Sequence, residues 1–270
     1  MSSVPTTPNG LHFIADSPVA GLAVAERRID MPQATLICVH GGLDRGGSFA
    51  RLARRIKDLD VVTYDRRGYQ GSRGLQPLSL ELHVEDLLAL ARYERARGPV
   101  IVFGHSYGGV VALRAALDDP SLFQLAVLYE APLPWLLRRG GPHAPLGDDP
   151  ERGAEAFFRR IVSDGAWERL SELERDSRRR DGVALKSDLS SLRDARYAPD
   201  LTQLQVPTTY AYGDERSPDY YHELSVLLAT LNPIIGSREL HNAGHGAHLS
   251  IADQLAAMIE SLWHETCASA

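Results

Sequence analysis

Short runs of apolar, often β-branched residues alternate along the chain with longer segments in which apolar positions recur every three or four residues. Runs of the first kind predict β-strands, and unbroken runs predict strands that are buried on both faces of a sheet. They cover residues 34–39, 61–64, 100–103, 125–129, 208–212 and 234–240, and residues 19–28 are expected to add an antiparallel strand at one edge.

Segments of the second kind predict amphipathic helices, because their apolar positions share one helical face. They cover residues 48–57, 80–97, 110–117, 219–231 and 251–263, and the Gly98-Pro99 pair ends the second of them. Strands that alternate with helices in this way are typical of the α/β class, in which helices flank a mostly parallel central sheet.

One stretch interrupts the alternation. Residues 132–206 place 75 residues between two predicted strands, whereas loops in α/β units usually have ~2–6 residues. The stretch begins rich in proline and glycine and continues as charged helix, with ten arginines against nine acidic residues over positions 138–180. This balance favours a solvated, ion-paired helical surface over an anion-binding patch. We expect a core of residues 1–131 and 207–270, with residues 132–206 inserted as a separate helical unit.

Composition excludes several classes of protein. The 270 residues are 44% hydrophobic and 24% charged, which is normal for a globular chain. The net charge of −6 argues against a nucleic-acid partner, and no apolar run approaches the ~20 residues that span a bilayer. The N-terminus lacks the features of a secretory signal, and Cys38 and Cys267 are expected to be free thiols. We therefore expect a cytoplasmic protein with a small-molecule substrate and no membrane partner; the sequence does not define an oligomeric state.

The first chemical motif is G-x-S-x-G at residues 104–108, directly after the strand 100–103 and before the helix 110–117. In this setting the glycines permit a tight strand-to-helix turn that presents the serine hydroxyl at the carboxyl end of the sheet. Ser106 is therefore the candidate nucleophile. The backbone N–H of Tyr107, at the helix N-terminus, is a candidate donor to an oxyanion.

The sequence His-Gly-Gly at residues 40–42 follows the strand 34–39. Glycine lets the backbone approach a developing oxyanion, so the N–H of Gly42 is the expected second donor, with that of Leu43 as the alternative. His40 ends a buried strand, and we expect it to support the loop by hydrogen bonding rather than to act in catalysis.

A general base is expected on a loop at the carboxyl edge of the sheet. Residues 244–248 read Gly-His-Gly-Ala-His and follow the last predicted strand. We favour His245 over His248, because it follows the strand sooner and is flanked by glycines. The remaining histidines outside these motifs are expected at the surface: His12, His83, His143, His222, His241 and His264.

Four motifs together, HGG at 40–42, YDRRGYQGS at 64–72, GHSYGG at 104–109 and AGHGAH at 243–248, resemble the α/β-hydrolase superfamily over residues 34–263. The resemblance implies an α/β-hydrolase fold with a helical cap, or lid, inserted after the strand 125–129. It also implies a catalytic triad in the chain order nucleophile, acid, histidine.

The triad acid departs from the commonest pattern of that superfamily. Most members carry G-x-x-D after the penultimate strand, and here Arg216 occupies the acid's place, with Asp214 in a different register. A minority, including certain haloalkane dehalogenases and zearalenone-type lactone hydrolases, take a glutamate directly after the strand that precedes the cap. Glu130 occupies that position, so we favour Glu130 and keep Asp214 as the alternative.

The resulting hypothesis is a serine hydrolase that forms an acyl-enzyme with an ester, lactone or thioester, as a carboxylesterase or lactonase does, and needs no metal or organic cofactor. A serine nucleophile disfavours dehalogenase and epoxide-hydrolase chemistry. Carbon–carbon bond hydrolysis, perhydrolysis, and a ligand receptor with vestigial turnover stay open as alternatives. A moderately hydrophobic substrate is expected against the apolar residues Leu133, Trp135, Phe157, Phe158 and Trp167.

Overall fold

The computed structural model describes residues 10–76, 78–137, 146–215 and 217–269. Within them, eight strands form one sheet in the order β1-β2-β4-β3-β5-β6-β7-β8. Strands β3 to β8 are parallel, whereas β1 and β2 pair antiparallel at one edge. The bounds are β1 His12–Phe13, β2 Val24–Arg27, β3 Ala34–Val39, β4 Leu59–Tyr64, β5 Val100–His105, β6 Leu125–Tyr129, β7 Thr208–Gly213 and β8 Ile235–Leu240. The predicted α/β class and the antiparallel edge are confirmed.

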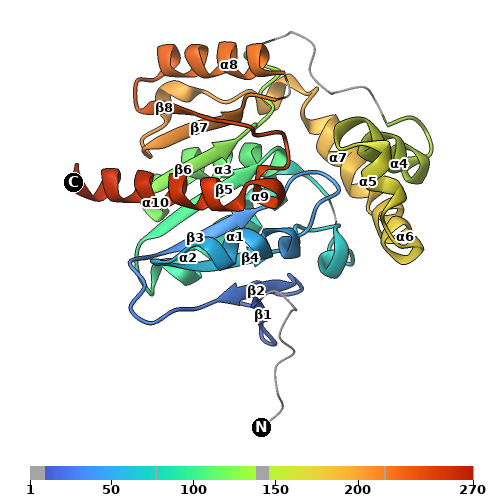
Figure 1. The fold of residues 1–270 in the computed structure, drawn as a ribbon, viewed down its shortest axis with the longest axis horizontal. Helices are drawn as coiled ribbons and strands as arrows, with labels where there is room; N and C mark the ends of the chain where they lie inside the picture. Colours follow the sequence, from blue (N-terminus) through green and yellow to red (C-terminus); the bar gives the residue numbers. More distant parts are fainter. Residues whose placement is uncertain (1–9, 77, 138–145, 216, 270) are drawn as a thin grey trace.

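Helices cover both faces of the sheet (Figure 1). One face packs against α1 (Ala50–Arg55), α9 (Ala247–Ser250) and α10 (Ala252–Ala268), and the other against α2 (Leu80–Arg95), α3 (Tyr107–Asp118) and α8 (Pro218–Leu231). In β3, Leu36 and Cys38 face the first layer, while Ile37 and Val39 face the second. Burial on both faces explains why the strand is apolar without alternation.

Short 3-10 helices complete the core and its connections. They span Gly46–Phe49, Gln70–Ser72, Pro120–Leu122, Ala195–Tyr197 and Leu201–Gln203. Over the described residues, no helix combines the length and the apolar character that a membrane crossing requires.

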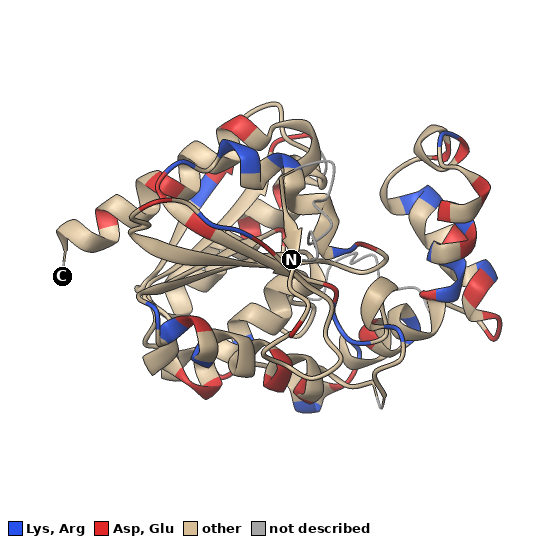
Figure 2. Cartoon of the chain, turned by 90° about the horizontal axis from the view of Figure 1, so that it is seen from below, with Lys and Arg blue, Asp and Glu red and all other residues tan. Residues whose placement is uncertain are grey.

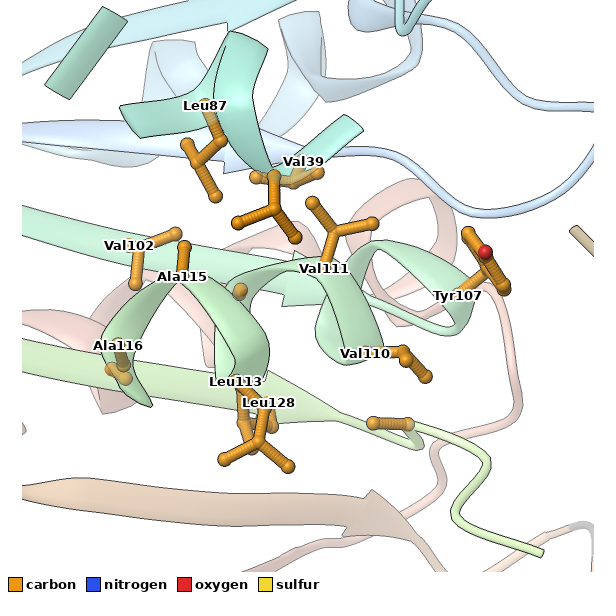
Figure 3. Close-up of a cluster of buried hydrophobic side chains, with 14 of the residues drawn as sticks. Val39, Leu87, Val102, Tyr107, Val110, Val111, Leu113, Ala115, Ala116 and Leu128 are labelled. Atoms are coloured by element: carbon orange, nitrogen blue, oxygen red, sulfur yellow. The ribbon is translucent and has the colours of Figure 1, made fainter. Parts of the chain in front are cut away.

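Helix α3 packs closely on the sheet because its inward positions are small (Figure 3). Ala112, Ala115 and Ala116 are at most 1% exposed, and Val111 lies beside them in the same buried cluster. Small side chains allow a helix to approach the strands beneath it, and a filled interface resists movement. The turn that joins β5 to α3 is therefore held in a fixed position.

The insertion between β6 and β7 contains α4 (Pro150–Ile161), α5 (Asp164–Glu168), α6 (Glu172–Arg180) and α7 (Gly182–Ser191). These helices lie to one side of the sheet (Figure 1), and acidic and basic residues alternate over them (Figure 2). Local signals set their ends: Asp149 caps α4 ahead of Pro150, and Ser171 and Glu174 form a capping box at α6.

A buried polar group attaches this insertion to the core. Arg66 follows β4, and its guanidinium lies 2.7 Å from the carboxylate of Asp188 in α7. The Tyr69 hydroxyl donates to the same carboxylate at 2.6 Å, and His83 lies 3.2 Å from it. His83 is 1% exposed, so its predicted surface position is wrong: helical periodicity cannot reveal that a segment about 100 residues later covers it. His143 lies outside the described residues.

Candidate active site

Ser106 occupies the sharp turn between β5 and α3. Its backbone has φ 52° and ψ −124°, a conformation that is strained for a residue with a side chain. The turn needs glycine beside it, since a Cβ on Gly108 would lie 2.1 Å from the carbonyl oxygen of Val39. The Ser106 N–H donates to the Tyr129 carbonyl at 2.8 Å, which fixes the turn to the next strand.

His245 and Glu130 meet at the carboxyl edge of the sheet. The Nδ1 atom of His245 lies 2.6 Å from Oε2 of Glu130, and the second carboxylate oxygen accepts the Gly213 N–H at 3.1 Å. Glu130 directly follows β6, is fully buried and has φ 47°. A carboxylate can only accept here, so Nδ1 donates and Nε2 is left with a lone pair for a proton.

Asp214 pairs with a different histidine. Its Oδ2 atom lies 2.6 Å from Nδ1 of His241, whose side chain is 79% exposed, and its Oδ1 accepts the Ala243 N–H at 3.2 Å. The structure therefore brings Glu130, and not Asp214, to His245. Arg216 lies outside the described residues. Whether Glu130 or Asp214 serves in catalysis stays a prediction for experiment.

Two hydrogen bonds hold the loop that carries His245. The His105 ring donates from Nε2 to the His245 carbonyl at 2.7 Å, and the Tyr129 hydroxyl donates to the Gly244 carbonyl at 2.8 Å. Both donors come from strands next to the nucleophile. Ser106 and His245 line one cavity, although no hydrogen bond between their side chains is present among the described residues. Catalytic hydrogen bonds often tighten only when substrate binds.

The loop after β3 is shaped by His40. Its Nδ1 donates to the Gly41 carbonyl at 2.7 Å, and its Nε2 accepts the Arg66 N–H at 2.8 Å. Both ring nitrogens are thus engaged, and burial lowers the pKa of His40 to about 3, which keeps the ring neutral at ordinary pH. The predicted supporting role of His40 is confirmed.

The candidate oxyanion donors lie next to this loop. Gly42 lines the cavity of Ser106, and Tyr107 is the first residue of α3, where a backbone N–H has no acceptor within the helix. Leu43 has φ 55°, and its carbonyl accepts a hydrogen bond from Arg178 of α6 at 2.5 Å. The structure places all three predicted candidates around the nucleophile, and their role stays a prediction.

The cavity at Ser106 has a volume of about 480 Å³. Helix α4 supplies an apolar wall that includes Phe157 and Phe158, both predicted to contact substrate. Its full lining is Gly42, Leu43, Asp44, His105, Ser106, Phe157, Phe158, Ile161, Val162, Arg169, Arg178, Gly244, His245, Gly246, His248, Leu249 and Ser250. A larger cavity, of about 790 Å³, opens at the opposite ends of β6 and β7 and contains none of the motif residues.

Leu133, Trp135 and Trp167 do not line the cavity of Ser106. Trp167 is fully buried with its ring 5.3 Å from that of Phe158, so it packs inside the insertion. The indole of Trp135 donates to the Asp194 carbonyl at 2.9 Å, and Leu133 is fully buried in the core. These three residues instead hold the insertion together and to the sheet, a distinction that composition cannot make.

A cluster of Asp44, His105 and His248 was not predicted as a unit. Nε2 of His248 lies 3.2 Å from Oδ2 of Asp44, and Nδ1 of His105 lies 3.9 Å from it. Burial opposes ionisation of Asp44, but His248 outweighs it and holds the pKa of the carboxyl well below its usual range. These are donor types that bind divalent metals. Nδ1 of His105 and both ring nitrogens of His248 are buried without a hydrogen-bond partner in the described part of the chain. In the sequence, the signal for this cluster is Asp44, two residues after the His-Gly-Gly motif.

The chain is similar in sequence to known hydrolases. A model of the alpha/beta hydrolase family matches residues 36–258. Lipase LipV of Mycobacterium tuberculosis is 25% identical over 231 residues, which cover 84% of this chain and 80% of that protein. Human monoglyceride lipase is 29% identical over 104 residues, but these cover only 36% of this chain and 34% of that protein.

Solved structures share the fold at low identity. Cfl2 from Burkholderia cenocepacia superposes with a TM-score of 0.73 at 18% identity, covering 95% of this chain and 98% of that one. MenH from S. aureus gives a TM-score of 0.68 at 18% identity, covering 92% of this chain and 99% of that one. With the family model matching most of its length, this chain belongs to the alpha/beta hydrolase family.

Proposed function

We propose that this protein is a serine hydrolase that cleaves an ester-type bond, in an ester, lactone or thioester, of a moderately hydrophobic small molecule. The observation that carries the proposal is the 2.6 Å contact between His245 and the fully buried Glu130. His245 lines the same cavity as Ser106. The similarity to a lipase over most of both chains supports the same class of bond.

The proposed reaction assigns each atom a task. His245 Nε2 takes the proton of the Ser106 hydroxyl as its oxygen attacks the substrate carbonyl, and Glu130 stabilises the imidazolium that forms. The N–H groups of Gly42 and Tyr107 donate to the oxyanion. The leaving alcohol or thiol then takes the proton from His245, and an acyl-enzyme remains on Ser106.

Water completes the cycle by the same route. His245 deprotonates the attacking water, a second oxyanion forms on the acyl carbon, and the Ser106 oxygen leaves with the proton that returns from His245. In this proposal the helical insertion of residues 132–206 is a cap over the nucleophile, and Phe157 and Phe158 on α4 contact the apolar part of the substrate.

A fluorophosphonate probe tests the proposal directly, because it reacts with an activated serine. We expect peptide mapping to find the label on Ser106. We also expect the Ser106→Ala variant to lose both labelling and hydrolysis of p-nitrophenyl butyrate. Hydrolysis by Ser106→Ala at the wild-type rate, or a label on another residue, would overturn the assignment. The Cys267→Ser variant is the control, since Cys267 is an exposed thiol that does not line the cavity of Ser106.

A further inference from the structure

Two groups of arginines in the helical insertion differ in their partners. Arg159, Arg175 and Arg179 do not line the cavity, and each forms at least two ion pairs with nearby acidic residues. This is the ion-paired surface that the charge pattern predicts. Arg169 and Arg178 do line the cavity of Ser106, and among the described residues neither has a carboxylate within ion-pair distance.

Arg178 is the more deeply placed of the two. Its Nη1 donates to the Leu43 carbonyl at 2.5 Å, and its guanidinium carbon lies 5.0 Å from the centre of the Phe158 ring. Its Nε atom is buried and has no acceptor in the described part of the chain. Burial, reinforced by the nearby positive charge of Arg45, lowers the pKa of Arg178 to about 10. The carboxylates of Asp44, Asp181 and Glu174 offset this effect only in part. A buried cation that is incompletely neutralised is unfavourable, so an anion placed there would be bound well.

Asp44, the acidic residue in the same cavity, offsets the charge of Arg178 only in part. Asp44 lies 3.2 Å from the ring of His248 and accepts a hydrogen bond from Ser48 at 2.9 Å. The direct contacts of its carboxylate are therefore with His248 and Ser48 and not with Arg178. Arg169 lies at the C-terminal end of α5, where its exposed side chain adds a second positive charge to the cavity.

We propose that the substrate carries a carboxylate that binds to Arg178, assisted by Arg169, while its apolar part lies along Phe157 and Ile161 of α4. This inference rests on the proposed serine-hydrolase function and narrows its substrate class to anionic esters. A carboxylate fits because it is compact, carries one charge and can accept from the guanidinium edge that is not committed to the Leu43 carbonyl.

Two matched pairs of substrates test the inference. p-Nitrophenyl hydrogen glutarate and p-nitrophenyl valerate differ in the acyl part, where a terminal carboxylate replaces a methyl group. 4-Acetoxybenzoate and 4-methylphenyl acetate make the same change in the alcohol part. For each pair, the ratio of kcat/KM for the anionic ester to kcat/KM for the neutral ester is measured in the wild type and in each variant. Comparing ratios removes the intrinsic difference in reactivity between the esters.

In one of the two pairs, we expect Arg178→Gln to lower this ratio by about ten- to a hundredfold, mostly through KM. Arg169→Gln should lower it less, because an exposed cation is screened. Arg178→Lys should keep part of the preference, since it keeps the charge. Arg180→Gln is the matched control: it removes the same charge from the same helix outside the cavity, and should leave the ratio unchanged.

The outcomes separate the two proposals. Arg178 also holds the Leu43 carbonyl, so its loss can slow both esters of a pair, but only an anion subsite changes their ratio. The pair that responds tells whether the carboxylate belongs to the acyl or the alcohol part. Unchanged ratios in both pairs, with the neutral esters still hydrolysed, would overturn the anion subsite alone. If the wild type itself hydrolyses none of these esters and takes up no fluorophosphonate label, the serine-hydrolase function is overturned instead.

Discussion

Replacing Glu130 by glutamine separates the two candidate acids. Glutamine has nearly the same shape, so its Oε1 can still accept the Gly213 N–H, and the side chain leaves no cavity. The carboxylate oxygen that lies 2.6 Å from His245 is replaced by an amide NH₂ group. The amide is neutral, so it does not stabilise a positive imidazolium as a carboxylate does. If the amide NH₂ faces His245, two donors oppose each other and the ring shifts to the tautomer with the proton on Nε2.

The size of the effect follows from this wrong tautomer. An imidazole with its proton on Nε2 cannot accept the proton of Ser106, and comparable substitutions in serine hydrolases lower kcat by about 10⁴-fold. At about 1.4 kcal/mol for each factor of ten, this corresponds to roughly 5.5 kcal/mol of transition-state stabilisation. KM should change little, because Glu130 is fully buried and does not line the cavity.

Steady-state hydrolysis of p-nitrophenyl butyrate by Glu130→Gln and Asp214→Asn measures this effect, with thermal unfolding of each variant as the check on folding. Asp214→Asn should stay close to wild type, because Asp214 pairs with the exposed His241. The reasoning is refuted if a folded Glu130→Gln enzyme keeps wild-type kcat while Asp214→Asn loses it.

Three further predictions concern stability and reactivity. Gly108→Ala should lower the thermal midpoint by several degrees, since overpacking costs ~1–3 kcal/mol and the new Cβ would lie 2.1 Å from a strand carbonyl; an unchanged midpoint would contradict the close approach. Arg66→Met should lower the free energy of unfolding in urea by ~3–5 kcal/mol by leaving the buried Asp188 carboxylate without its arginine partner, and adding Asp188→Leu should recover part of it. Although burial opposes it, Arg66 holds the pKa of Asp188 below its ordinary 3.8. The pair therefore stabilises the fold above that pH, and the contribution is lost as pH falls below it. Between pH 6 and pH 3, the thermal midpoint should fall less for Asp188→Asn than for the wild type. Finally, one thiol for each native chain should react with Ellman's reagent and two after unfolding, because Cys267 is exposed while burial raises the pKa of Cys38; two reactive thiols in the native protein would contradict this.

Much of the fold could be predicted because it depends on local signals. The strands 34–39 and 125–129 have the predicted bounds, since an apolar run between turn residues is sufficient to define a buried strand. The candidate nucleophile and base could be named because Ser106 directly follows one strand and His245 lies on the loop after another. Parallel strands bring their carboxyl ends to one edge, and Ser106 and His245 consequently line the same cavity.

The sequence could not predict which acidic residue pairs with His245. Glu130 and Asp214 both follow strands, and only the course of the loops decides that Glu130 lies 2.6 Å from His245 while Asp214 turns to His241. The aromatic residues of the insertion show the same limit. Phe157 lines the cavity and Trp167 is buried inside the insertion, although both are aromatic residues on helices of the insertion.

The sequence by itself determined the class of fold, the order of its elements and the turn that carries Ser106, because periodicity and glycine placement act over a few neighbouring residues. The tertiary structure alone decided which charges are paired. Arg66 meets Asp188 across 122 positions, whereas Arg178, on a helix with charges of both signs, lines the cavity without a carboxylate at ion-pair distance among the described residues. The physical reason is that the strength and partner of a charge depend on distance and burial in space, and neither is encoded in the spacing of residues along the chain.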